Sequence, residues 1–107
     1  MAVSPIDLAA DANFEGYLHG SAVSFFREHA PRPGTGPRLH RHPYSETFLI
    51  HAGSALFTVG DERVVGSANQ VLVVPAFVAH RFEVLDRGEY IATHIHESDR
   101  FITEWLE

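Results

Sequence analysis

The chain has 107 residues, a net charge of −6 and 45% hydrophobic residues, which fits one globular domain with a single core. It contains no cysteine, so disulfides, thiolate metal sites and cysteine nucleophiles are excluded. All eight basic residues are arginine, which excludes a lysine Schiff base and a P-loop lysine. The acidic balance argues against a nucleic-acid or membrane partner. Eight histidines in so short a chain instead favour metal binding or acid–base chemistry.

The predicted organisation is an N-terminal arm over residues 1–19 followed by one domain over 20–107. The first residues include acids and no apolar run, unlike a signal peptide. No stretch reaches the roughly 18 consecutive apolar residues that a membrane-spanning helix needs. We therefore expect a cytoplasmic protein.

The predicted elements are short strands separated by turn residues. In chain order, strands are expected at 23–29, 46–51, 55–59, 63–65, 71–74, 79–85 and 90–96. Residues 31–37 read as a loop, and Gly60-Asp61-Glu62 is typical of a hairpin turn. In the tail, i,i+4 spacing of apolar residues behind Ser98 predicts a helix over 98–107. The pattern indicates an all-β barrel or sandwich with one short C-terminal helix.

Three residues that can bind metal share one parity on a predicted extended segment. His40, His42 and Glu46 are separated by even numbers, so their side chains project from one face. His80 begins a later strand and becomes a fourth ligand if a barrel brings it alongside. Three imidazoles and one carboxylate suit Mn, Fe, Ni, Cu or Zn. On spacing alone, the alternative is a pair of surface histidines beside a loop.

The same segment resembles the first motif of the cupin superfamily, G-x5-H-x-H-x3-E-x6-G. Gly34, His40, His42, Glu46 and Gly53 match all five defining positions at the family spacing. The resemblance is to small single-domain cupins of the cupin 2 conserved barrel type, and it covers about residues 20–96. It implies a single β-barrel (a double-stranded β-helix, or jelly roll). It also implies that the four residues singled out above bind one divalent first-row transition metal.

The second cupin motif, G-x5-P-x-G-x2-H-x3-N, is only partly present. Pro75 and His80 match it, whereas Asn69, Phe77 and Val84 replace its first Gly, its second Gly and its final Asn. Asn tolerates a left-handed backbone better than most residues, so Asn69 is a mild departure. Phe77 is a larger departure, because it places a bulky ring near the mouth of the barrel.

Parity also predicts the residues around the metal. Phe48 and Ile50 follow Glu46 on its face, and Phe82 and Val84 follow His80, so with Phe77 they give an apolar pocket lining. Tyr44, His94 and His96 are candidates for a second shell, with His94 and His96 also possible acid–base groups or extra ligands. However, Ile91, Thr93 and Ile95 occupy the other face of that strand. Sheet cores favour Ile, so the Ile face is the one expected inside.

These features favour a metal-dependent enzyme, by family resemblance a dioxygenase-like oxidoreductase that acts on a small, partly apolar molecule. The alternative is a non-catalytic ligand-binding or sensing module with a structural metal. An isomerase acting on sugars fits less well, because the sequence offers no obvious separate general base. Exposed sheet edges and outward apolar residues such as Leu49 predict a homodimer.

Overall fold

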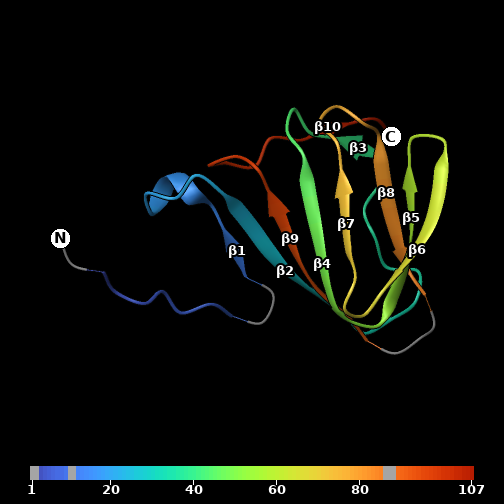
Figure 1. Cartoon of the computed structure of the whole chain (residues 1–107), viewed down its shortest axis with the longest axis horizontal. Coiled ribbons are helices and arrows are strands. Elements are labelled where there is room, and N and C mark those ends of the chain that lie inside the picture. Colours follow the sequence, from blue (N-terminus) through green and yellow to red (C-terminus); the bar gives the residue numbers. More distant parts are fainter. Residues whose placement is uncertain (1–2, 10–11, 86–88) are drawn as a thin grey trace.

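The computed structural model describes residues 3–9, 12–85 and 89–107, and these form two facing antiparallel sheets (Figure 1). The first sheet has the order β1 (Asn13–Phe14), β2 (Ser24–Ala30), β9 (Tyr90–His96), β4 (Glu46–Ala52), β7 (Val71–Val74). The second has the order β10 (Glu104–Trp105), β3 (His40–Arg41), β8 (His80–Val84), β5 (Ser54–Val59), β6 (Glu62–Ser67). A single turn of 3-10 helix, η1 (Gly16–Leu18), follows β1. The predicted all-β barrel of jelly-roll type is confirmed.

The strands follow from period-two alternation in the sequence. Along β4, β8 and β9, buried and partly exposed residues alternate, so every second side chain enters the space between the sheets. The core there is aromatic and aliphatic, with Phe48, Phe57 and Tyr90 as its largest fully buried hydrophobic side chains. All three lie 1% exposed or less, so the two sheets are joined by a continuous apolar layer.

Glycines stand where the chain reverses direction between strands. Gly60 adopts a left-handed φ of 57° in the β5–β6 hairpin, at the turn that the sequence predicts. Gly53 adopts a φ of 74° between β4 and β5, and a Cβ placed there would meet the backbone of Glu89 and Tyr90. The register of β4 against β9 shifts between Ile50 and Ala52, which leaves His51 on the outer face.

The C-terminal helix predicted over 98–107 is wrong. This segment is extended, and its strand β10 pairs with β3 through Glu104 opposite Arg41 and Trp105 opposite His40. Apolar residues at i,i+4 are equally consistent with alternate positions of a strand. Here pairing with β3 and the packing of the Phe101 ring against Phe26 and His96 outweigh helix propensity, which for one short segment is a weak preference.

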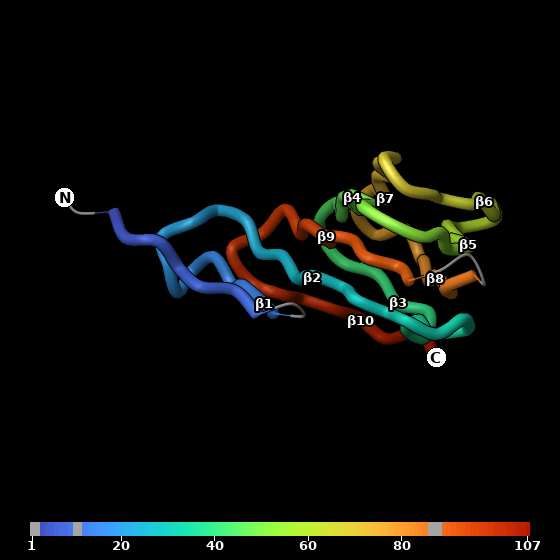
Figure 2. The backbone as a smooth tube through the Cα atoms, turned by 90° about the horizontal axis from the view of Figure 1, so that it is seen from below, coloured from blue at the N-terminus to red at the C-terminus, as the bar shows by residue number. Residues whose placement is uncertain are grey.

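Within the described residues, the N-terminal segment joins the barrel from Ala12 onward, because the Ala12 carbonyl accepts from the N–H of Arg27 in β2. Asn13 and Phe14 pair with Phe26 and Phe25 of β2, while residues 3–9 extend away from the barrel (Figures 1 and 2). Within the described ranges, no helix is long and apolar enough to cross a membrane.

Candidate metal centre

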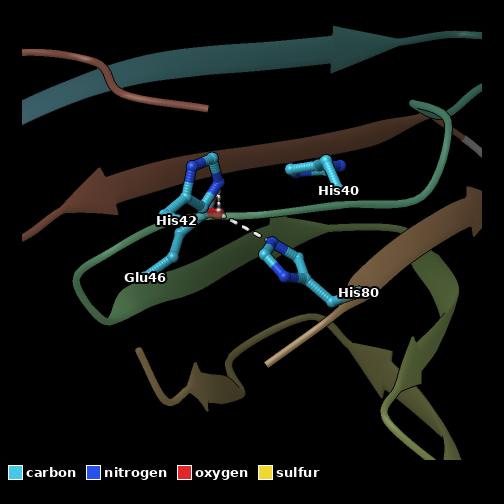
Figure 3. A group of neighbouring side chains, drawn as sticks. All are labelled: His40, His42, Glu46 and His80. Carbon is cyan, nitrogen blue, oxygen red and sulfur yellow. Dashed lines mark hydrogen bonds and ion pairs between the residues drawn. The ribbon is translucent and has the colours of Figure 1, made fainter. Parts of the chain in front are cut away.

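Four buried side chains from separate parts of the chain converge at one end of the barrel (Figure 3). Their ligating atoms all lie within 4.8 Å of one another, so shifts of a few tenths of an ångström would bring them to about 2.0–2.3 Å from one ion. We call this group the His/Glu cluster: His40 on β3, His42 after β3, Glu46 at the start of β4 and His80 at the start of β8. His40 and His80 are direct cross-strand partners, which places their rings side by side.

Each histidine of the cluster is oriented by a backbone carbonyl. Nδ1 lies 2.7 Å from Arg38 O in His40, 2.8 Å from Ile102 O in His42 and 2.9 Å from Val78 O in His80. A carbonyl can only accept a hydrogen bond, so in all three rings Nδ1 carries the proton. Each neutral ring therefore keeps its lone pair on Nε2. This is the arrangement that fixes the tautomer of metal-binding histidines in proteins.

The Nε2 atoms of the cluster converge on the Glu46 carboxylate. Oε1 lies 3.0 Å from Nε2 of His42 and 3.1 Å from Nε2 of His80 (Figure 3). Among the described residues, buried Nε2 of His42 has no partner in hydrogen-bonding geometry. Two lone pairs facing a carboxylate repel it unless a positive charge lies between them, either a proton on the ring or a metal ion. The residues present thus fit a divalent cation.

The protonation states of the cluster agree with metal binding. Burial lowers the pKa of His40, which favours the neutral imidazole that binds metal. Burial alone would raise the pKa of Glu46, but hydrogen bonds from the imidazoles of His42, His80 and His96, wherever these rings carry the Nε2 proton, hold it well below its usual range. Glu46 is therefore ionised at neutral pH, as a metal ligand must be.

A cavity of about 450 Å³ opens beside the cluster. Its walls are mainly aromatic, with Phe26, Phe48, Phe82, Phe101 and Trp105 among the lining residues. The polar groups that also line it include three cluster residues and the two inward histidines of β9. A volume of this size with a few clustered polar groups is typical of a site for a small molecule.

The predicted pocket residues divide into three groups. Phe48 and Phe82 line the cavity, whereas Ile50 and Val84 lie in the adjoining core, 1% exposed each. Phe77 does not line the cavity, because its side chain is 63% exposed. Its backbone adopts a φ of 66°, and its N–H donates to the carbonyl of His42, so the ring is carried outward. Asn69 likewise adopts a left-handed φ of 67°, as its place in the second motif suggests.

The histidine face of β9 points inward, contrary to the expectation that the isoleucine face would. His94 and His96 are buried, while Ile91 and Ile95 are only partly covered on the outer side. The reason is register: Glu46 pairs with His96, and cross-strand partners project to the same face of a sheet. Glu46 therefore brings the imidazoles inside, where Oε2 of its carboxylate lies 3.2 Å from Nε2 of His96.

The C-terminal segment also contacts the site, which the helix predicted for it did not indicate. Phe101, Thr103 and Trp105 line the cavity, and the ring of Trp105 lies 5.1 Å from that of His40. The alternation of 101, 103 and 105 was the signal for a strand with one face on the site. In contrast, the carbonyl of Ile102 that orients His42 is a backbone group, which no side-chain pattern could have identified.

Comparisons with known proteins agree with this architecture. The family model described as "Cupin domain" matches residues 29–95. A comparison with curated protein sequences finds no match.

Three solved structures illustrate the likeness of fold. A cupin superfamily protein from Desulfitobacterium hafniense has a TM-score of 0.63 at 21% identity, with 70% of this chain and 66% of that one covered. A cupin 2 conserved barrel domain protein from Rhodopseudomonas palustris has a TM-score of 0.72 at 16% identity, over 83% and 61%. A recombinant oxalate oxidase in complex with glycolate has a TM-score of 0.74 at 18% identity, with 91% of this chain and 54% of that one covered. This chain spans less than two thirds of each of them. The match over residues 29–95, together with the barrel and its His/Glu cluster, shows that the chain belongs to the cupin family.

Proposed function

We propose that the chain is a metal-dependent, dioxygenase-like enzyme that holds one divalent first-row ion in the His/Glu cluster and oxygenates a small, partly apolar molecule. The observation that carries the metal half is the tautomer pattern. Three carbonyls hold the Nδ1 protons, so the Nε2 lone pairs of His42 and His80 face one carboxylate oxygen, and His40 offers a ligand atom within 4.8 Å of the same group. A bound redox-active ion would supply the electron transfer that activates dioxygen.

The cavity supports the substrate class. Its aromatic walls, from Phe26, Phe48, Phe82, Phe101 and Trp105, would bind and exclude water from an apolar part of the ligand. The neighbouring cluster would bind a polar part. Solved neighbours include oxalate oxidase, whose substrate oxalate has no apolar part. The five aromatic side chains in the walls of this cavity favour a less polar molecule.

A non-catalytic binding module with a structural metal is the second candidate. It is favoured by the position of the cluster, which joins β3, β4 and β8 and, through His42 and Ile102, the C-terminal segment. An ion there would tie four parts of the barrel together. If the metal is structural, its free energy of binding is folding free energy, and chelation should greatly lower the melting temperature.

The test begins with metal analysis of untagged protein purified without added metal. We expect about one first-row ion per chain, and none in His42→Ala, with the far-ultraviolet circular dichroism of a β-barrel retained. His51→Ala is the matched control, because His51 lies on the outer face of β4 and should leave the metal content unchanged. Uptake of dioxygen by the loaded protein with small aromatic and aliphatic acids then separates the candidates. Metal content without dioxygen uptake, together with a large loss of melting temperature on chelation, would favour the structural role.

A further inference from the structure

A fourth imidazole contacts Glu46, but its hydrogen bonds differ from those of the cluster. Nε2 of His96 lies 3.2 Å from Oε2 of Glu46, on the oxygen opposite the one that faces His42 and His80. Its Nδ1 does not meet a carbonyl. It lies 2.6 Å from the hydroxyl of Tyr44 instead. A hydroxyl can donate or accept, so the tautomer of His96 depends on what else bonds to Tyr44.

The backbone of Ile102 resolves that choice. Its N–H donates to the Tyr44 hydroxyl oxygen over 3.1 Å. The hydroxyl hydrogen then has His96 Nδ1 as its acceptor, since no other acceptor bonds to it among the described residues. Nδ1 of His96 is therefore unprotonated, and the proton is on Nε2, facing Glu46.

From this contrast we infer that His96 is a positioning residue, held by Tyr44, whose Nε2–H faces Oε2 of Glu46 at 3.2 Å, outside hydrogen-bonding geometry as it stands, and leaves Oε1 for the metal. The part of the inference that concerns the metal, namely that Oε1 of Glu46 binds it, rests on the proposed function. The cluster histidines offer lone pairs, whereas His96 offers a proton, so it is not a fifth ligand. Glu46 is thereby fixed to present one oxygen toward the other ligands.

Packing around the pair supports a fixed orientation. The ring of Tyr44 stacks on that of His42 with centroids 5.1 Å apart and planes within 5°. Phe101 packs edge-on against His96 at 4.9 Å. Tyr44 and His96 are both buried, so neither ring can turn without displacing the C-terminal segment.

The test uses zinc as the probe and the full chain. We expect His96→Leu to weaken zinc binding 10–100-fold in a chelator competition, and Tyr44→Phe to weaken it about tenfold. His96→Gln should stay within about threefold of the parent, because the Gln amide can place an N–H near the position of Nε2. Tyr90→Phe is the matched control: it removes the hydroxyl bonded to His94 (3.1 Å), a buried Tyr–His pair without a contact to Glu46 among those described.

A second measurement uses the parent protein alone, so it depends neither on a zinc affinity nor on whether a variant folds. Long-range proton–nitrogen NMR of the metal-free parent, at alkaline pH where imidazoles are neutral, should show the Nε2–H tautomer for His96 and Nδ1–H for His40, His42 and His80. An Nδ1–H tautomer of His96, or direct binding of its Nε2 to zinc, would overturn the inference. So would His96→Leu that binds zinc like the parent, or His96→Gln as weak as His96→Leu. If the parent itself takes up no zinc, the proposed function fails and takes the metal half of the inference with it.

Discussion

Acidification should destabilise this protein through His94, which is buried between the sheets with no exposed surface. Its Nε2 is bonded to the Tyr90 hydroxyl, and its buried Nδ1 has no hydrogen-bond partner among the described residues. Burial lowers the pKa of His94 from its ordinary 6.5 to about 4. The folded chain thus keeps this ring neutral over a range in which the unfolded chain protonates it.

The sign and size of the effect follow from proton linkage. Stability falls as the pH falls wherever the unfolded state binds more protons, so the contribution of His94 is complete above pH 6.5 and is lost as the pH falls toward 4. At 1.36 kcal/mol for each pH unit, the difference between 6.5 and about 4 amounts to about 3 kcal/mol. About 2.5 kcal/mol of this should be gone by about pH 4.5.

The assay is urea unfolding of the chelated, metal-free protein at several pH values from about 7.5 to 4.5. In His94→Gln this linkage is absent, so the free energy of unfolding of the parent minus that of the variant should fall by about 2.5 kcal/mol across the range. Phe57→Leu is the control, because its ring contacts among the described residues are to Phe48 and Phe82, so it destabilises the core without a titrating group and should keep the parent's pH dependence. A parent–variant difference that changes by less than about 1 kcal/mol would refute the reasoning.

Three further predictions concern the backbone and the assembly. Phe77→Gly should raise the free energy of unfolding by about 0.5–1 kcal/mol in urea unfolding, because it relieves a left-handed φ of 66° on an exposed side chain; a loss of stability would count against strain there. Gly53→Ala should lower it by roughly 2 kcal/mol or more, since the new Cβ meets the backbone of Glu89 at a φ of 74°, and an unchanged urea midpoint would contradict this. We also propose a homodimer, because edge strands β6 and β7 expose valines 45–60%. Light scattering at micromolar concentration should give about twice the chain mass of 11.9 kDa.

The sequence by itself determined the strands and most of the His/Glu cluster. The motif spacing identified His40, His42 and Glu46 as ligands, but they do not share one strand face: His40 lies on β3 and Glu46 on β4 of the facing sheet, with bends at residues 43 and 44 between them. Gly53 and Gly60 marked reversals because their φ values are costly for other residues. These are local effects, which depend on neighbours in the chain and so can be predicted from it.

The tertiary structure alone decided which face of β9 looks inward and what the C-terminal segment does. Residue hydrophobicity favoured Ile91 and Ile95 inside, but the pairing of Glu46 with His96 placed the histidines there. The helical spacing of the tail was likewise overridden by pairing with β3. Both outcomes depend on contacts between residues far apart in the chain, whose free energy exceeds the local preferences. The tautomers of His42 and His96 depend in the same way on the backbone of one distant residue, the C=O and N–H of Ile102.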